Sequence, residues 1–152
     1  MTTGRRRLAR ERALCILYEA ELKGVPTSSV LSDLGVEPDE FAVHLVMEVT
    51  KRRCEVDELI QRHSEGWAIE RMPCIDRNVL RISVAELLDE VLEVPAPVVI
   101  SEAVELAKMY STEQSASFVN GLLSGVLIDV EGASRVPYPA HRGTVEERPK
   151  QA

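Results

Sequence analysis

The sequence predicts an all-α fold, and three observations support this prediction. Apolar residues recur every three or four positions through most of the first 130 residues, as on one face of an α-helix. Glycine and proline fall between these stretches, where helices end. No stretch alternates apolar and polar residues as a half-buried strand does. At 152 residues, 45% of them hydrophobic, the chain is long enough to bury a core.

Two helices are predicted at the start of the chain. The first covers residues 8–22, because its apolar side chains fall on one face. Gly24, followed by Pro26, then stops it. A short helix over residues 28–34 follows, and Gly35 closes it.

A long amphipathic segment is predicted next, over residues 40–63. Asp39 precedes it, and an acidic group is favourable at the positive end of a helix. A break near Cys54 stays open as an alternative to one continuous helix. The stretch from Gly66 to Pro73 is predicted to be irregular.

Three more helices complete the predicted bundle, over residues 75–92, 98–109 and 115–130. A Val-Pro-Ala-Pro segment at residues 94–97 separates the first from the second. Its last proline is suited to the first turn of the helix that follows.

The predicted domain organisation is one helical domain over residues 1–130 and a tail over residues 131–152. The tail is polar and is interrupted by glycine and proline, so it offers little surface to bury. We therefore expect it to be disordered.

The charge of the chain is unevenly distributed. The first twelve residues hold five arginines and one glutamate, a formal charge of +4, whereas the whole chain has −7. The arginines are Arg5, Arg6, Arg7, Arg10 and Arg12. A basic end on an acidic chain favours a polyanionic partner, because arginine binds phosphate through strong, salt-sensitive contacts. A solvated helix end or an expression scar is the alternative.

Several classes of function lack their usual signals. The three cysteines form no CxxC pair, which favours free thiols in a reducing cytoplasm. There is no apolar segment typical of a signal peptide or a membrane span. The histidines lack metal-ligand spacing, and no glycine-rich phosphate loop is present. We therefore expect a cytoplasmic protein without metal, cofactor or catalytic residues.

Three isolated features allow more than one interpretation. Gly121 and Gly125 form a GxxxG pattern, which indicates a helix face in close contact with a neighbouring helix or with a ligand backbone. Trp67 is interpreted as a core or hinge residue. His63, near the end of its predicted helix, is interpreted as a favourable cation there.

Four segments in this order resemble the NusB family of bacterial transcription antitermination factors. They are RRRLARE at residues 5–11, IDRNVLRI at 75–82, SEAVELAK at 101–108 and FVNGLL at 118–123. The resemblance covers residues 5–130, and the tail lies outside it.

The resemblance implies a bundle of about seven helices in two packed helical sub-bundles. It also implies binding in place of catalysis. Members of the family pair with NusE, a small-subunit ribosomal protein, and recognise the single-stranded boxA element in leader RNA of ribosomal RNA operons. With other Nus factors they act on RNA polymerase and limit premature termination.

The resemblance also implies RNA-binding residues. These are Arg5, Arg6, Arg7 and Arg10, with Lys108, Phe118 and Asn120. On a helix the arginines would form one basic edge that holds phosphates, giving affinity but little sequence choice. Phe118 matches an aromatic position near the RNA and is either a stacking residue or a core residue. Asn120 either contacts RNA or satisfies a helix junction.

The same resemblance implies a surface for NusE. Asp76 matches an acidic position that pairs with NusE, and Tyr18 and Glu70 match positions at or near that interface. Acidic side chains there would complement a basic ribosomal protein. Asp76 has a second interpretation, as a cap or first-turn carboxylate. Gln114 departs from the acidic residue that relatives often have before Ser115, which predicts stronger intrinsic RNA binding.

Two alternatives remain beside the antitermination hypothesis. The same helical domain occurs ahead of a methyltransferase in enzymes that modify ribosomal RNA, but no Rossmann-like unit is visible in this sequence. A homodimer that covers its own RNA surface, as a storage form, is the other.

Overall fold

The structure is a computed structural model that describes residues 3–135. This part of the chain folds into α1 (Thr3–Lys23), α2 (Thr27–Ser32), α3 (Glu40–Lys51), α4 (Arg53–His63), α5 (Cys74–Leu88), α6 (Ala96–Tyr110) and α7 (Glu113–Arg135), with a 3-10 turn, η1 (Ile69–Arg71), between α4 and α5. The all-α prediction is confirmed. None of the helices described is long and apolar enough to cross a membrane.

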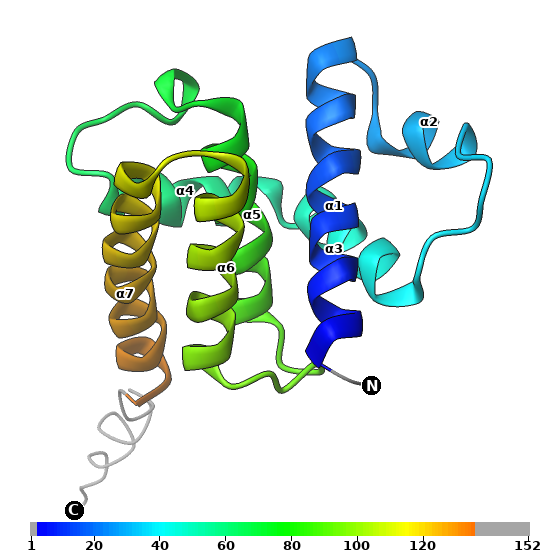
Figure 1. Cartoon of the computed structure of the whole chain (residues 1–152). Helices are drawn as coiled ribbons and strands as arrows, with labels where there is room; N and C mark the ends of the chain where they lie inside the picture. Colours follow the sequence, from blue (N-terminus) through cyan, green and yellow to red (C-terminus); the bar gives the residue numbers. More distant parts are fainter. Residues whose placement is uncertain (1–2, 136–152) are drawn as a thin grey trace, which may run out of the picture.

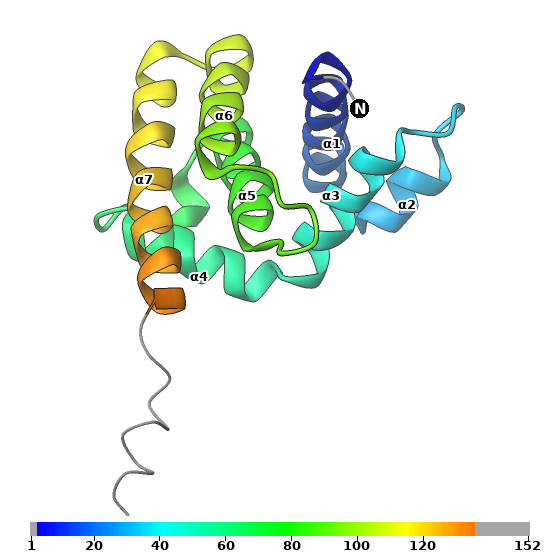
Figure 2. The same ribbon diagram turned by 90° about the horizontal axis from the view of Figure 1, so that it is seen from below.

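Helix α5 lies at the centre of the molecule. It packs against α1, α3, α4, α6 and α7. Helices α1, α2 and α3 form one side of the molecule, and the α6–α7 hairpin forms the other (Figure 1). Seen from below, α4 runs beneath α5 and links the two sides (Figure 2). This arrangement agrees with the expected two packed sub-bundles.

The core fills the space around α5. Its largest fully buried side chains include Leu14, Ile16, Leu45, Ile60, Leu80, Ile82 and Leu123. These residues come from α1, α3, α4, α5 and α7, so one continuous core joins the two sub-bundles.

The ends of the helices follow local chemistry. Gly24 adopts a φ of +67°, a left-handed conformation that glycine reaches without steric cost and that ends α1. The Asp39 carboxylate accepts a 2.7 Å hydrogen bond from the backbone N–H of Phe41 and caps α3. The segment predicted over residues 40–63 is broken at Arg52, close to the alternative break near Cys54.

Predicted boundaries were wrong for three helices. Helix α1 begins at Thr3, five residues before its predicted start at residue 8. Helix α5 ends at Leu88, because the Asp89 carboxylate accepts hydrogen bonds from the backbone N–H groups of Val91 and Leu92 and holds a turn there. Helix α7 begins at Glu113 and continues to Arg135, past the predicted end at residue 130. The rest of the predicted tail, residues 136–152, lies outside the described residues.

Close contact between α4 and α7 explains one glycine of the GxxxG pattern. A Cβ on Gly125 would lie 2.8 Å from Nδ1 of His63, whereas a Cβ on Gly121 would meet nothing within 4 Å. The His63 ring is held on this face by Asp129, whose Oδ2 lies 2.9 Å from Nε2. Only Gly125 therefore serves the close approach that the pattern predicted.

Candidate RNA and partner interface

The first two arginines of the basic segment lie at the start of α1. The Arg5 side chain is 65% exposed, and its Nε lies 3.0 Å from Oδ2 of Asp39. The Arg6 guanidinium lies 4.5 Å from the centroid of the Phe41 ring, within range of a cation–π contact. Hydrogen bonds from Phe41 N–H and from Arg5 lower the pKa of the Asp39 carboxyl. Both arginines are held against the start of α3.

Arg7 joins α1 to α6. Its guanidinium donates two hydrogen bonds, of 2.9 and 2.8 Å, to the two carboxylate oxygens of Glu102. The hydrogen bonding between the two side chains lowers the pKa of the Glu102 carboxyl and raises the pKa of the Arg7 guanidinium. The Arg7 side chain is still 42% exposed while it is paired.

Arg10 does not belong to the expected basic edge. It is 3% exposed, and its guanidinium donates bonds of 2.7 and 2.8 Å to the two carboxylate oxygens of Glu86 in α5. The reason is its helical phase, since it lies between the buried Ala9 and Ala13 on the face of α1 that meets α5. The expectation of a solvent-facing Arg10 is corrected to a buried ion pair between helices.

Lys108 and Asn120 lie together. Both line a shallow hollow between α6 and α7, which Glu113 also borders. Both side chains are exposed. Lys108 lies six residues beyond Glu102, the partner of Arg7, which is about 9 Å along α6. The basic start of α1 and this hollow therefore border the same helix.

Phe118 lies on another side of α7, where it meets Trp67. The two rings pack edge to face, with centroids 5.2 Å apart. Trp67 is 39% exposed, so its interpretation as a core residue is wrong. Phe118 is partly buried against the core, and it also lines a hollow with Trp67. Both of its interpretations therefore remain compatible with the structure.

Asp76 is buried, not presented on the surface. It is 2% exposed and lies in the first turn of α5, as its second interpretation predicted. Ser115 Oγ in α7 donates a 2.7 Å hydrogen bond to Asp76 Oδ2. Asp76 Oδ1 is buried and accepts no hydrogen bond from the described residues. Asp76 also lines a hollow together with Trp67 and Phe118.

Tyr18 and Glu70 flank the same end of α5. Glu21, one turn after Tyr18, pairs with Arg77 and accepts a 3.1 Å bond from Asn78. Arg77 also donates to backbone carbonyls of η1 and of the residue after it. Glu70 is an exposed residue of η1. The three expected partner residues therefore border the start of α5 from three elements.

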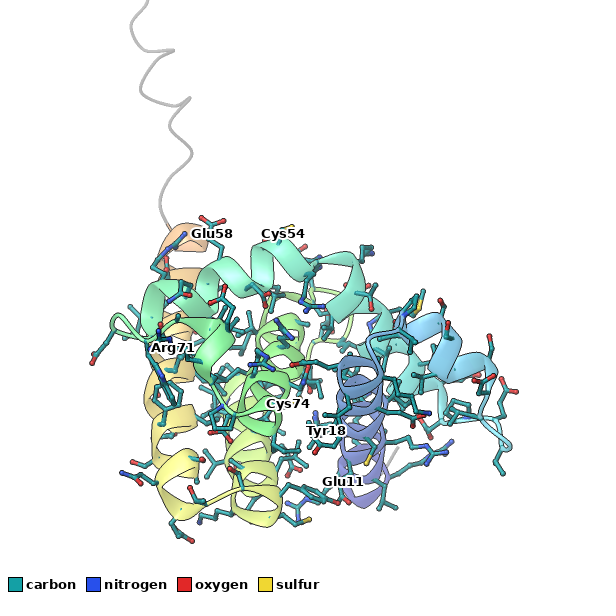
Figure 3. All side chains as sticks on the ribbon, turned by 90° about the horizontal axis from the view of Figure 1, so that it is seen from above. Glu11, Tyr18, Cys54, Glu58, Arg71 and Cys74 are labelled. Carbon is teal, nitrogen blue, oxygen red and sulfur yellow. The ribbon has the colours of Figure 1, made fainter. Side chains whose placement is uncertain are left out.

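The side-chain view shows this arrangement (Figure 3). Tyr18 lies further along α1 than Glu11, toward the start of α5, where Cys74 is labelled. Arg71, in η1, lies on the far side of that start. Glu11 accepts a 2.8 Å hydrogen bond from the Tyr110 hydroxyl and so joins α1 to the end of α6.

Two histidines of the described residues have carboxylate partners. His44 Nε2 lies 2.7 Å from Asp89. His63, in the last turn of α4, lies 2.9 Å from Asp129. All three cysteines are free. Within residues 3–135 no group of three or more His, Cys, Asp or Glu could hold a metal ion.

Sequence reasoning missed three residues that shape this site: two buried glutamates and one exposed tryptophan. Glu86 and Glu102 fix two of the arginines, but as single glutamates on amphipathic helices they look like ordinary solvent-facing positions. The interpretation of Trp67 as a core or hinge residue does not indicate its exposed ring. Its place directly after Gly66, in a stretch without apolar periodicity, is the one signal that could have indicated an exposed ring.

Known proteins resemble this chain over most of its length. The model of the NusB family matches residues 7–127. A transcription antitermination protein NusB from Acidothermus cellulolyticus is 43% identical over 135 residues, which cover 86% of this chain and 92% of that protein.

Solved structures agree with the sequence match. T. maritima NusB is 34% identical with a TM-score of 0.73, covering 84% of this chain and 92% of that one. A chain from a crystal structure of the antitermination factors NusB and NusE in complex with dsRNA is 29% identical with a TM-score of 0.71, covering 84% of this chain and 99% of that one. The family model, the sequence identity to curated NusB proteins and the similarity to a solved NusB structure all agree. The chain belongs to the NusB family.

Proposed function

We propose that this protein binds boxA-type single-stranded RNA together with NusE and acts as a transcription antitermination factor. It joins the other Nus factors on RNA polymerase, in the cytoplasm, by binding and without catalysis. The observation that carries the proposal is the basic start of α1. Arg5 and Arg6 lie against the start of α3, and Arg7 pairs with Glu102 on α6, the helix that also carries Lys108.

The proposed RNA contacts divide into two kinds. Arg5, Arg6, Arg7 and Lys108 hold phosphates, because their side chains are cationic and reach solvent. Phe118 and Asn120 contact bases, by stacking and by amide hydrogen bonds respectively. Arg10 is not among the proposed RNA contacts, because its guanidinium is buried and paired with Glu86.

The proposed NusE surface is the start of α5 and its neighbours. Tyr18 and Glu70 offer an aromatic and an acidic contact to a basic partner. Support comes from the similar chain solved with NusE and dsRNA. Arg10 and Asp76 are buried and support this surface indirectly. Arg10 holds α1 against α5 through Glu86, and Asp76 holds α7 against α5 through Ser115.

A gel-shift titration tests this proposal. The full chain is titrated against boxA RNA, a scrambled strand and a boxA duplex, each with and without NusE. We expect the single boxA strand to bind most tightly, and NusE to increase the affinity further. Equal binding to boxA and to the scrambled strand in the presence of NusE would refute the proposal. Light scattering on the same samples detects a homodimer that RNA dissociates.

A further inference from the structure

Glu102 on α6 holds one edge of the Arg7 guanidinium. The two bonds, of 2.9 and 2.8 Å, start from Nε and Nη2 of Arg7 and end on the two carboxylate oxygens. A guanidinium carries five N–H donors in a fixed plane, so this pairing uses two of them. The three that remain, two on Nη1 and one on Nη2, lie on the next edge. We propose that Glu102 is a positioning residue for RNA, which fixes Arg7 so that this second edge binds a phosphate.

The inference rests on the proposed RNA-binding function, and it depends on a carboxylate that is itself firmly held. Glu102 is 5% exposed, because its helical phase places it beside the buried Val99 and Ala103. The hydrogen bond from Arg7, with a further contribution from the charge of Arg10, lowers the pKa of the Glu102 carboxyl. The carboxylate is therefore ionised at neutral pH and accepts both bonds from the guanidinium.

Arg10 shows the same pairing in a buried setting. Its Nε and Nη2 donate to the two oxygens of Glu86, as those of Arg7 do to Glu102. The Arg10 side chain is 4% exposed, so it is not available to a ligand, whereas the Arg7 side chain is 42% exposed. The two arginines are fixed by the same edge, and exposure separates the structural one from the one that can meet RNA.

Two further carboxylates lie near Arg7 and have partners of their own. The pKa of the Arg7 guanidinium is raised chiefly by its ion pair, and the charges of Glu105 and Glu11 raise it further. Glu11 accepts a 2.8 Å hydrogen bond from the Tyr110 hydroxyl, and Glu105 Oε2 lies 3.9 Å from Lys108 Nζ. The second edge is therefore left for a ligand. Phosphate suits it, because two phosphate oxygens accept parallel bonds from one edge of a guanidinium.

A positioning role and a simple charge effect predict opposite signs. A carboxylate near RNA repels phosphate, so by charge alone its removal should strengthen binding. By positioning, removal of Glu102 should weaken binding, because a loose arginine side chain has to be ordered when the RNA binds. The sign of the change therefore distinguishes the two.

Gel-shift titration of the full chain with boxA RNA in the presence of NusE tests this. Glu102→Gln replaces one acceptor oxygen with an amide group, so the two parallel bonds cannot both form. We expect boxA affinity to fall about fivefold. The slope of log affinity against log salt should shrink by about 0.7, the loss of one phosphate contact on single-stranded RNA. The matched control is Glu105→Gln, which removes the same charge about one turn further along α6 and should leave boxA affinity unchanged or raise it.

Two further variants show whether the effect passes through Arg7. In a chain that carries Arg7→Ala, adding Glu102→Gln should no longer weaken binding. Arg7→Lys keeps the charge but has no second edge, so it should bind boxA more weakly than wild type does. This last variant leaves Glu102 in place, so it decides the matter even if Glu102→Gln unfolds. Melting temperature and NusE affinity report whether each variant is folded.

The outcomes separate this inference from the proposed function. Unchanged or stronger boxA binding in folded Glu102→Gln would overturn the inference. An equal loss on adding Glu102→Gln to Arg7→Ala would also overturn it, as would wild-type affinity in Arg7→Lys. Failure of the proposed function would appear in the wild-type protein, as boxA bound no better than a scrambled strand.

Discussion

At the scale of single residues, helical phase decides what each arginine of the basic segment does. Arg5 and Arg6 lie over the start of α3, Arg7 is paired but half-exposed, and Arg10 is buried. The composition of the segment predicts a polyanion site. The composition does not predict which arginines form ion pairs with carboxylates, because Glu86 and Glu102 lie far from the segment in the sequence.

The buried pair makes a prediction about stability. Glu86→Gln should lower the free energy of unfolding by about 3–5 kcal/mol, because it leaves the Arg10 guanidinium buried without a counter-charge. Glu19→Gln is the matched control, since Glu19 pairs with Lys23 at 2.7 Å on the surface. Its cost should stay within about 1 kcal/mol. Urea denaturation of both variants measures the difference, and equal costs would contradict the structural role of Arg10.

The half-exposed pair makes a prediction about pH. Arg7 lowers the pKa of Glu102 below its ordinary value of 4.5, so the unfolded chain binds this proton more readily than the folded one. The stabilisation is present above that ordinary value and is lost as pH falls through the lower, folded pKa. Glu102→Gln should therefore be less stable than wild type at pH 7, and the difference should shrink in acid. Urea denaturation at a series of pH values tests this, and a difference independent of pH would refute it.

Gln114 makes a prediction about affinity. Its side chain is exposed and borders the hollow that already holds the Asp76 carboxylate. Gln114→Asp adds a negative charge where we propose that RNA binds, so boxA affinity should fall, more at low salt than at high salt. Gel shifts at two salt concentrations measure this. Unchanged or stronger binding would show that the RNA does not pass this position.

At the scale of elements, each helix was predictable where local signals fixed it. Glycine ended α1 and an acidic residue capped α3, and apolar periodicity predicted the longer helices of the described residues, with α3 and α4 as one segment that has an open alternative of a break. The end of α5 was missed because Val91 and Leu92 continue the apolar pattern while Asp89 binds their backbone N–H groups. Periodicity does not reveal this competition, since the same aspartate is acceptable inside a helix.

The α4–α7 contact makes a prediction about two glycines. Gly121→Ala should stabilise the protein by up to about 1 kcal/mol, because alanine favours the helix and the new Cβ meets nothing within 4 Å. Gly125→Ala should destabilise it, because its Cβ would displace the His63 ring from Asp129. Thermal unfolding of the two variants measures both signs. Equal stabilisation by both would contradict the close packing of α4 on α7.

At the scale of the whole molecule, charged pairs connect the sub-bundles through α5. Glu86 and Arg81 in α5 pair with Arg10 in α1 and Asp57 in α4. Glu21 adds a further link from α1. The fold class and the family were predictable, because periodicity and linear motifs lie within the sequence. The arrangement of the site was not, because it depends on pairs that join distant segments.

The salt dependence of RNA binding tests the central claim, that the start of α1 holds phosphates. The titration compares wild type with a variant that carries Arg5→Ala and Arg6→Ala, whose side chains contact Asp39 and Phe41 at the start of α3. We expect the slope of log affinity against log salt to shrink by about 0.7 for each lost phosphate contact, with NusE affinity and melting temperature nearly unchanged. An unchanged slope and unchanged boxA affinity would contradict the claim.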